Sequence, residues 1–168
     1  MNDLAVLPEA TLPAAPGPIH IAPMSLVEIN NVRELEAMVG QLEQVQIATD
    51  HVFHAGLYAR TVMVPAGVII TGVLIKIATL LIVHGDALVY VNGGARQVSG
   101  YNVITASAGR KQAFVAQTDT YLTMIFRSDS DTVEQAEAEF TDEVDILMSN
   151  GEVGINRVTV TGEKSWLA

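Results

Sequence analysis

The chain has no cysteine and few basic residues. Its 168 residues include nine Lys and Arg against 19 Asp and Glu, which gives a formal net charge of −10. Without cysteine there is no disulfide, thiolate metal site or cysteine nucleophile. The acidic balance opposes binding to a phosphate backbone, and an aromatic content of 5% leaves few rings for stacking on bases. We therefore expect no direct nucleic-acid ligand.

Charge of either sign is sparse. Charged residues make up 17% of the chain and the mean hydropathy is +0.33. A length of 168 residues suits one domain. For a soluble domain of this size the composition is apolar. We therefore predict a homo-oligomer in which part of the apolar surface is buried between copies.

The N-terminal region has no basic residue before Arg33. A secretory signal begins with positive charge, and a transit peptide is rich in arginine. The sequence therefore predicts no secretion signal and synthesis in the cytoplasm of the cell that makes the protein.

The longest apolar stretch runs from Val62 to Val83 and carries a single charge, Lys76. Its length is sufficient for a membrane helix, which is one interpretation. However, Pro65-Ala66-Gly67 interrupts it, and a lysine inside a membrane span costs about 2.5 to 3.5 kcal/mol. Its many Val, Ile and Thr residues favour strands. We therefore predict strands separated by turns, and no membrane partner.

Both ends of the chain are predicted to be arms. Residues 1–24 hold five of the six prolines and favour an extended arm, which is either a disordered tail or a contact with a neighbouring subunit. Residues 149–168 form a tail with a short strand at Arg157 to Thr161 and the single Trp, which either folds back or docks on a neighbour. The apolar residues predicted to make these contacts are Leu4, Leu7, Leu12, Ile19, Ile21, Trp166 and Leu167.

A single amphipathic helix is predicted within residues 25–46. Asn30 or Asn31 provides a cap, and the helix runs to about Gln46. Its apolar stripe is Leu35, Met38, Val39, Leu42 and Val45. Glu34, Glu36 and Glu43 lie off this stripe and are predicted to be solvated.

Residues 47–128 change to short apolar runs separated by turn residues such as Asn92-Gly93-Gly94. Many short strands at this spacing indicate a sandwich or barrel. The predicted strands are Ile47 to Phe53, Tyr58 to Val64, Val73 to Thr79, Leu80 to Val83, Ala87 to Val91, Ala95 to Val98, Asn102 to Ala106, Lys111 to Ala116 and Tyr121 to Arg127.

Residues 129–148 are acidic and predict a second helix packed on the barrel. Thr132 and Gln135 have capping-box spacing, and Val133, Ala136, Phe140 and Val144 form the apolar stripe. The carboxylates also raise the possibility of a calcium site. The segment lacks the Asp-x-Asp-x-Asp-Gly loop of such sites, so a packed helix is the preferred interpretation.

Several turns and strands occur in a familiar order, and the order resembles the cupin superfamily of small jelly-roll barrels. More closely, it resembles a cupin-like protein of tailed bacteriophages. The resemblance implies a mainly β fold: one jelly-roll barrel, a helix before it, an acidic helix after it, and terminal arms. The segments that carry it are Gly56-Leu57-Tyr58-Ala59-Arg60, Val64-Pro65-Ala66-Gly67, Thr71-Gly72, His84-Gly85-Asp86, Gly109-Arg110-Lys111 and Asp119-Thr120.

Cupins that bind a metal use His-x-His, a Glu and a later His, which the resemblance places within Val73 to Thr79 and near Lys111 to Gln117. Neither segment contains such a ligand. His51 and His54 are three residues apart, which in a strand puts them on opposite faces, so we expect surface or interface histidines. We predict no metal, no cofactor and no catalytic residue.

With its metal ligands replaced, the barrel is predicted to be a packing scaffold and not an enzyme. The phage resemblance implies a structural protein of the virion, most simply a capsid cement or decoration protein that contacts other virion proteins such as the major capsid protein. One alternative is an accessory protein of the tail or collar. Another is a soluble cupin-like module whose interior binds a small ligand, with Lys76 or Arg60 pairing an anionic group.

Overall fold

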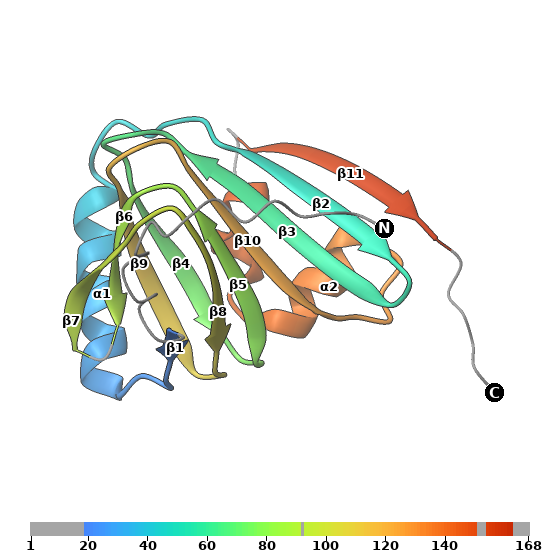
Figure 1. Cartoon of the computed structure of the whole chain (residues 1–168), viewed down its shortest axis with the longest axis horizontal. Coiled ribbons are helices and arrows are strands. Elements are labelled where there is room, and N and C mark those ends of the chain that lie inside the picture. Colours follow the sequence, from blue (N-terminus) through green and yellow to red (C-terminus); the bar gives the residue numbers. More distant parts are fainter. Residues whose placement is uncertain (1–18, 92, 151–153, 163–168) are drawn as a thin grey trace, which may run out of the picture.

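The computed structural model describes residues 19–91, 93–150 and 154–162, and these form two packed β-sheets with flanking helices (Figure 1). Sheet A has the order β1-β8-β5-β10-β3-β2-β11, and sheet B has the order β4-β9-β6-β7. The strands are β1 His20–Ile21, β2 Ala48–His54, β3 Leu57–Val64, β4 Ile69–Ile75, β5 Thr79–His84, β6 Ala87–Val91, β7 Gly94–Val98, β8 Tyr101–Ala106, β9 Arg110–Ala116, β10 Thr120–Arg127 and β11 Ile155–Thr161. The predicted mainly β architecture is confirmed.

Strands β3 to β10 form a jelly roll. Four of them, β8, β5, β10 and β3, are neighbours in sheet A, and the other four make up sheet B, with antiparallel pairing throughout. Apart from the β6–β7 hairpin, consecutive strands therefore alternate between two facing sheets, as in a jelly roll. Alternation along β5 shows how the core is built: Leu81 and Val83 are buried between the sheets, whereas Leu80 and His84 face outward.

The apolar stretch weighed as a membrane helix forms the end of β3, all of β4 and most of β5. No helix among the described residues is long and apolar enough to span a membrane. The strand predicted at Val73 to Thr79 begins earlier, at Ile69, because a register shift between Thr71 and Leu74 lets β4 pair with β9 over its whole length. Lys76 consequently lies in the turn after β4.

Helix α1, Leu26–Val39, starts at a different cap from the one predicted. The Ser25 hydroxyl accepts a hydrogen bond from the Glu28 amide, and the Glu28 carboxylate accepts one from the Ser25 amide, which completes a capping box. The cap expected at Asn30 or Asn31 is therefore wrong. The helix ends before Gly40, well short of Gln46.

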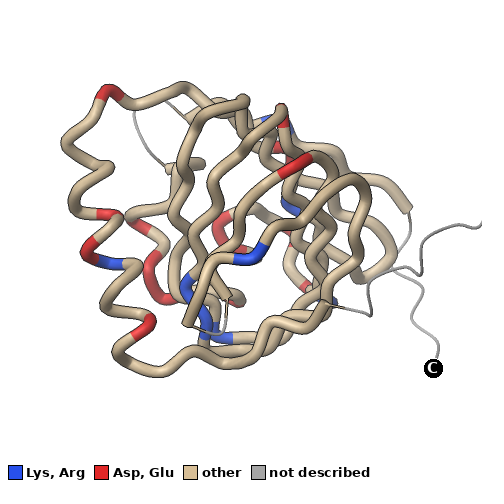
Figure 2. The backbone as a smooth tube through the Cα atoms, turned by 60° about the vertical axis from the view of Figure 1, so that its left-hand side comes forward, with Lys and Arg blue, Asp and Glu red and all other residues tan. Residues whose placement is uncertain are grey.

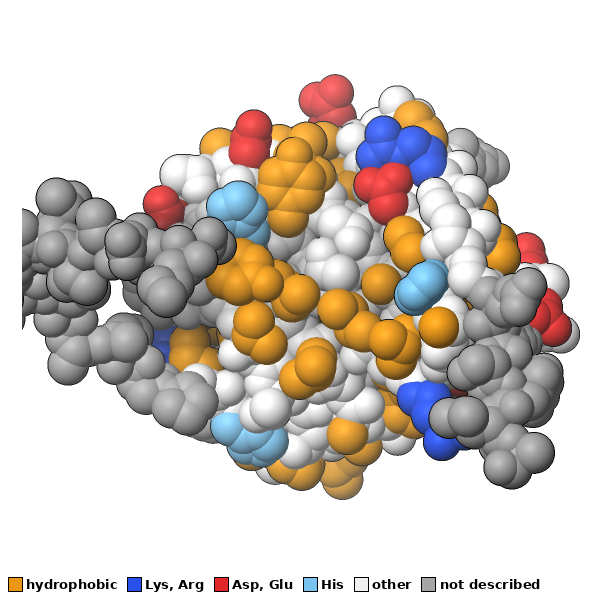
Figure 3. All heavy atoms as spheres, turned by 45° about the vertical axis from the view of Figure 1, so that its right-hand side comes forward, with side chains coloured by type: hydrophobic (Ala, Val, Ile, Leu, Met, Phe, Trp, Pro, Cys, Tyr) orange, Lys and Arg blue, Asp and Glu red, His pale blue; other side chains and the backbone are white. Residues whose placement is uncertain are grey.

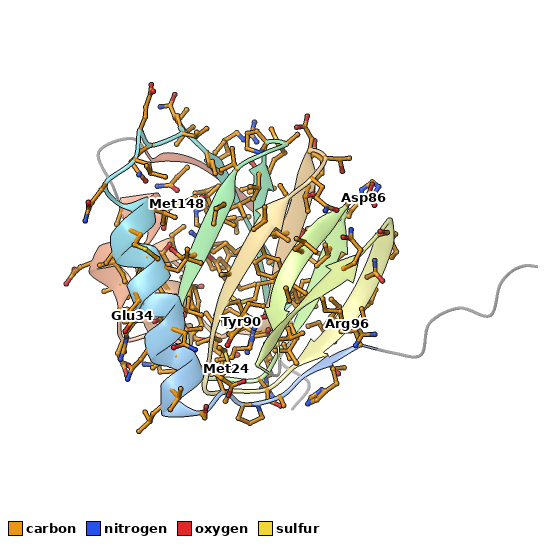
Figure 4. All side chains as sticks on the ribbon, turned by 90° about the vertical axis from the view of Figure 1, so that its left-hand side faces the viewer. Met24, Glu34, Asp86, Tyr90, Arg96 and Met148 are labelled. Atoms are coloured by element: carbon orange, nitrogen blue, oxygen red, sulfur yellow. The ribbon has the colours of Figure 1, made fainter. Side chains whose placement is uncertain are left out.

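The buried face of α1 also differs from the predicted stripe. Ile29 and Val32 pack on the outer face of sheet B with Met24, which Figure 4 shows beside the N-terminal end of the helix. Met38, Leu42 and Val45 of the expected stripe are exposed instead.

Helix α2, Val133–Phe140, is shorter than the predicted acidic helix. It begins as expected, with the Thr132 hydroxyl accepting from the Gln135 amide. It ends at Phe140, and two 3-10 turns follow, Val144–Ile146 and Met148–Asn150. This whole segment packs against sheet A where β2, β3 and β10 extend beyond sheet B (Figure 1).

The two ends add strands at the margins of sheet A. β1 pairs in parallel with β8, and Ile19 and Ile21 are buried in the core of their own chain, which corrects their assignment as contacts with a neighbour. Strand β11 pairs in parallel with β2, so the strand predicted at Arg157 to Thr161 is confirmed. The other predicted contact residues, Leu4, Leu7, Leu12, Trp166 and Leu167, lie outside the described residues.

Large apolar side chains are exposed on the outer face of sheet A. Figure 3 shows hydrophobic side chains gathered across this face. They come from neighbouring strands β8, β5, β10 and β3, at outward-facing positions. The main contributors are Tyr101, Val103, Leu80, Tyr121, Met63 and Leu57.

Candidate functional site

A cavity of about 130 Å³ lies between the two sheets. Its walls come from β3, β4, β5, β9 and β10, and the segment from Phe140 to Met148 closes one side. Apolar side chains dominate the lining: Val62, Val73, Ile75, Leu81, Phe114 and Leu122. Such a cavity, mostly apolar with few polar groups, is the usual form of a small-molecule site.

Arg110, the first residue of β9, brings a positive charge into the cavity wall. Its side chain is 2% exposed. The guanidinium donates hydrogen bonds to the carbonyls of Ile77 (3.2 Å) and Ser107 and to the hydroxyl of Thr79 (2.7 Å). All three acceptors are neutral, and no carboxylate in the described part of the chain lies within ion-pairing distance of Arg110. Burial lowers the pKa of Arg110 to about 10, so the charge persists at neutral pH.

Gln112 lies two residues along β9 and therefore faces the same cavity. Its side-chain amide donates to the carbonyl of Tyr90 at 3.3 Å. Its carbonyl oxygen, Oε1, is buried and has no hydrogen-bond partner among the described residues. A buried acceptor without a donor is costly, so a donor in the cavity would be stabilising.

Arg60 on β3 contributes a second guanidinium, but its charge is compensated. Its Nε lies 4.0 Å from Oε1 of the buried Glu137 on α2 and has no hydrogen bond within the described structure. Glu137 in turn accepts hydrogen bonds from Ser149 (2.5 Å) and Asn150 (3.0 Å). Burial lowers the pKa of Arg60, while nearby Tyr58 and Glu137 oppose that shift. Arg110 is therefore the uncompensated cation of the cavity.

A buried histidine lies behind Arg60. His51 on β2 is within 2.7 Å of the Tyr58 hydroxyl through Nδ1 and 3.1 Å of Asn156 Oδ1 through Nε2. Burial lowers the pKa of His51 and raises that of Tyr58, so both are neutral at pH 7. His51 is thus a core residue, which corrects its assignment to a surface or interface. His54 is exposed on the opposite face, as the strand period predicted.

The residues in the cavity do not fit a metal ion. Val73 and Ile75 point inward from the segment where the resemblance placed the first ligands, and neither has a donor atom. Gln112 comes from the segment of the later histidine, beside a cation that repels a metal. Among the described residues, no group of three or more His, Asp or Glu is placed to hold a metal ion.

Of the two cations expected to pair an anionic group, one lies outside the cavity. Lys76 pairs with Asp142 at 2.5 Å on the surface. Arg60 lines the cavity but is already beside Glu137. Sequence reasoning missed Arg110, although Gly109-Arg110-Lys111 was among the segments of the resemblance. The available signal was the two-residue period that puts Arg110 and Gln112 on one face of β9.

No protein-family model matches the sequence, and no curated protein matches it. Similar folds occur among solved structures. KdgF from Halomonas sp. is 21% identical, with a TM-score of 0.42 over 54% of this chain and 88% of that one. The Cupin_2 domain of an XRE family transcriptional regulator from Enterobacter cloacae is 9% identical, with a TM-score of 0.41 over 48% of this chain and 96% of that one. Ectoine synthase from P. lautus is 13% identical, with a TM-score of 0.41 over 51% of this chain and 67% of that one.

The expectation that the protein is not an enzyme does not stand, because it rested on the missing metal ligands alone. One of the solved structures with a similar fold is named as a synthase. Loss of histidines removes one kind of chemistry only, and the cavity keeps polar groups of other kinds. The strand order gives this chain a jelly-roll fold, and the solved structures with a similar fold include a Cupin_2 domain.

Proposed function

We propose that the protein binds a small carboxylate-bearing ligand in the cavity between its sheets. The observation that carries the proposal is Arg110, a buried cation in the cavity wall with no carboxylate partner among the described residues. Burying an isolated charge is expensive, and a ligand anion would offset that cost. The proposal develops the predicted small-ligand module and moves its anion-binding role from Lys76 or Arg60 to Arg110.

A carboxylate suits the site for two reasons. The planar guanidinium matches the geometry of a carboxylate, and the pairing is strong where water is scarce. The volume of about 130 Å³ and the apolar walls suit a short organic acid better than a polyanion. Oε1 of Gln112, which is unpartnered in the described structure, would accept a hydrogen bond from a ligand hydroxyl or from a water that enters with it.

Calorimetric titration with butyrate tests the proposal. We expect saturable binding to the wild-type protein and at least about tenfold weaker binding to Arg110→Gln. Arg110→Lys should have an intermediate affinity, because it keeps the positive charge but loses the paired N–H donors of the guanidinium. Gln112→Glu is nearly isosteric and places a competing carboxylate beside Arg110, so it is expected to abolish binding. Arg127→Gln, on an exposed residue of β10, is the matched control.

The proposal is overturned if butyrate gives no saturable heat, or if Arg110→Gln and Gln112→Glu, each checked for folding by thermal melting, bind as tightly as the wild type. Two variants of different chemistry guard against a simple folding defect. A loss of affinity in Arg127→Gln equal to that in Arg110→Gln would also contradict it, because binding would then follow net charge and not the cavity.

The virion role is not the function proposed. None of the three similar structures described above is named as a virion protein. Ile19 and Ile21, two of the residues expected to contact neighbours, are part of the chain's own core. Homo-oligomerisation stays a prediction, for which the outer face of sheet A is the surface we favour.

A further inference from the structure

A second hollow, which we call the outer chamber, adjoins the cavity. It has a volume of about 550 Å³ and lies between the loop after α1, the turn from β3 to β4, and the turns after α2. Figure 4 shows Met148 beside the upper end of α1, close to this chamber. Ile70, Thr71, Ile146 and Met148 line both spaces. The two hollows are therefore adjacent, and these four residues lie at the boundary between them, which we call the passage.

The outer chamber has apolar and acidic lining residues. Leu42, Val45 and Ile69 line it and are 64%, 47% and 39% exposed, so they present apolar surface to solvent. Its charged lining residues in the described part of the chain are Glu36, whose carboxylate lies 3.2 Å from the ammonium of Lys111, and Glu43. A chamber of this kind favours a hydrocarbon chain and disfavours a second anion.

We infer that the ligand is an amphipathic monocarboxylate whose carboxylate lies at Arg110 and whose apolar chain passes between Ile70 and Ile146 into the outer chamber. The inference rests on the proposed function, since it assumes the carboxylate at Arg110. It adds the class of ligand: an unbranched or lightly substituted aliphatic acid longer than the cavity itself can hold. An acid with a carboxylate at each end would place its second charge in the chamber that Glu43 lines, without a free cation among the lining residues, and is disfavoured.

The size of the chain-length effect follows from apolar burial. Each methylene transferred from water into the passage and chamber is expected to tighten binding about fourfold. The gain should begin once the chain is long enough to leave the inner cavity. It should stop when the chain reaches the open side of the chamber.

The test compares butyrate, hexanoate, octanoate and octanedioate by calorimetry, all below micelle-forming concentrations. For the wild-type protein we expect affinity to rise with each step in chain length and octanedioate to bind more weakly than octanoate. Leu42→Ser removes apolar surface from the outer chamber at a residue that is 64% exposed and does not line the inner cavity, so the fold and the carboxylate site are preserved. It should reduce the gain between butyrate and octanoate and leave butyrate unchanged. Val27→Ser, at a residue that is 70% exposed on α1 and remote from both hollows, is the matched control.

The outcomes separate the two proposals. If butyrate binds through Arg110 but octanoate binds no more tightly, or Leu42→Ser keeps the full gain, the inference about the chain is overturned and the carboxylate site stands. If octanedioate binds as tightly as octanoate, the acidic chamber does not select and the inference is equally wrong. If no acid binds, the proposed function and the inference are both overturned.

Discussion

The ammonium of Lys111 lies 3.1 Å from the carboxylate of Glu143, and the lysine side chain is completely buried. Glu36 of α1 approaches the same ammonium at 3.2 Å. Figure 2 shows acidic residues at several positions along α1. Glu36 of this helix was predicted to be solvated, but it pairs with the buried lysine. Through Lys111, strand β9 holds both α1 and the segment that closes the cavity.

Replacement of this lysine is expected to be strongly destabilising. Lys111→Met leaves two partly buried carboxylates without their cation, which should lower the free energy of unfolding by about 3 kcal/mol. Urea unfolding of the variant and of Arg127→Met, at an exposed residue, measures the difference. A loss below about 1 kcal/mol would show that the network is no stronger than a surface ion pair.

Acid should weaken the same network. Burial alone would raise the pKa of Glu143, but hydrogen bonds from the Leu74 amide, Lys111 and Arg33 outweigh it and lower the pKa. A carboxyl group with a lowered folded pKa stabilises the fold above its unfolded pKa, and this stability is lost as the pH falls through the folded value. Unfolding free energies measured below about pH 5 should fall less steeply in Glu143→Gln than in the wild type. Equal slopes in the two proteins would contradict this.

His51 predicts a second pH effect at milder acidity. Because its pKa is lowered mainly by burial, the unfolded chain takes up a proton near its ordinary value of about 6.5 while the folded chain stays neutral. Stability should therefore fall as the pH drops from about 7.5 to 5.5, by at most about 1.4 kcal/mol per pH unit. His51→Gln should flatten this part of the profile, and the exposed His54→Gln should not. A slope unchanged by His51→Gln would refute the account.

Gly85 should tolerate no side chain. Its φ is +135°, and a Cβ there would lie 2.6 Å from the Thr120 hydroxyl and 2.8 Å from the Asp119 carbonyl. Gly85→Ala is expected to cost about 1 to 3 kcal/mol. Gly94→Ala, where a Cβ meets no described atom within 4 Å, should change stability by less than about 0.5 kcal/mol. Similar melting temperatures for the two variants would argue against the close approach of the β5–β6 turn to β10.

The outer face of sheet A predicts self-association. Tyr101 and Tyr121 flank His84 across three neighbouring strands, with ring centroids 6.1 and 6.3 Å from the histidine, and both tyrosines are at least 49% exposed. A second copy is the partner that the low charge density favours. Light scattering should show a dimer or larger assembly that Val103→Lys weakens and Val27→Lys, on α1, does not. A wild-type protein that is monomeric at high concentration would contradict the prediction.

Local signals explain which parts of the fold could be predicted from sequence. Ala87 to Val91 was predicted to the residue because turn-forming residues bound it on both sides. The predicted bounds of β4 were wrong because no turn-forming residues mark its ends within the apolar stretch. Its register is fixed by pairing with β9. Helix α1 was misplaced because the Ser25 and Glu28 capping box was overlooked, and its buried face depends on sheet B.

The candidate site was harder to predict because it depends on which face of a strand is inside. Arg110 and Lys111 are adjacent cations, and alternation requires them to face opposite ways. The sequence does not say which one enters the barrel; the packing of α1 over Lys111 decides it. Glu137 and Glu143 belong to the acidic segment for which only a packed helix was predicted, and only the tertiary fold pairs them with Arg60 and Lys111.

The most direct test of the central claim is an NMR titration that follows the side-chain Nε–Hε resonances of the arginines as butyrate is added. The resonance of Arg110 is expected to shift and saturate, with a smaller change at Arg60, while that of the exposed Arg127 stays constant. No shift at Arg110, or equal unsaturable shifts at all arginines, would contradict carboxylate binding in the cavity.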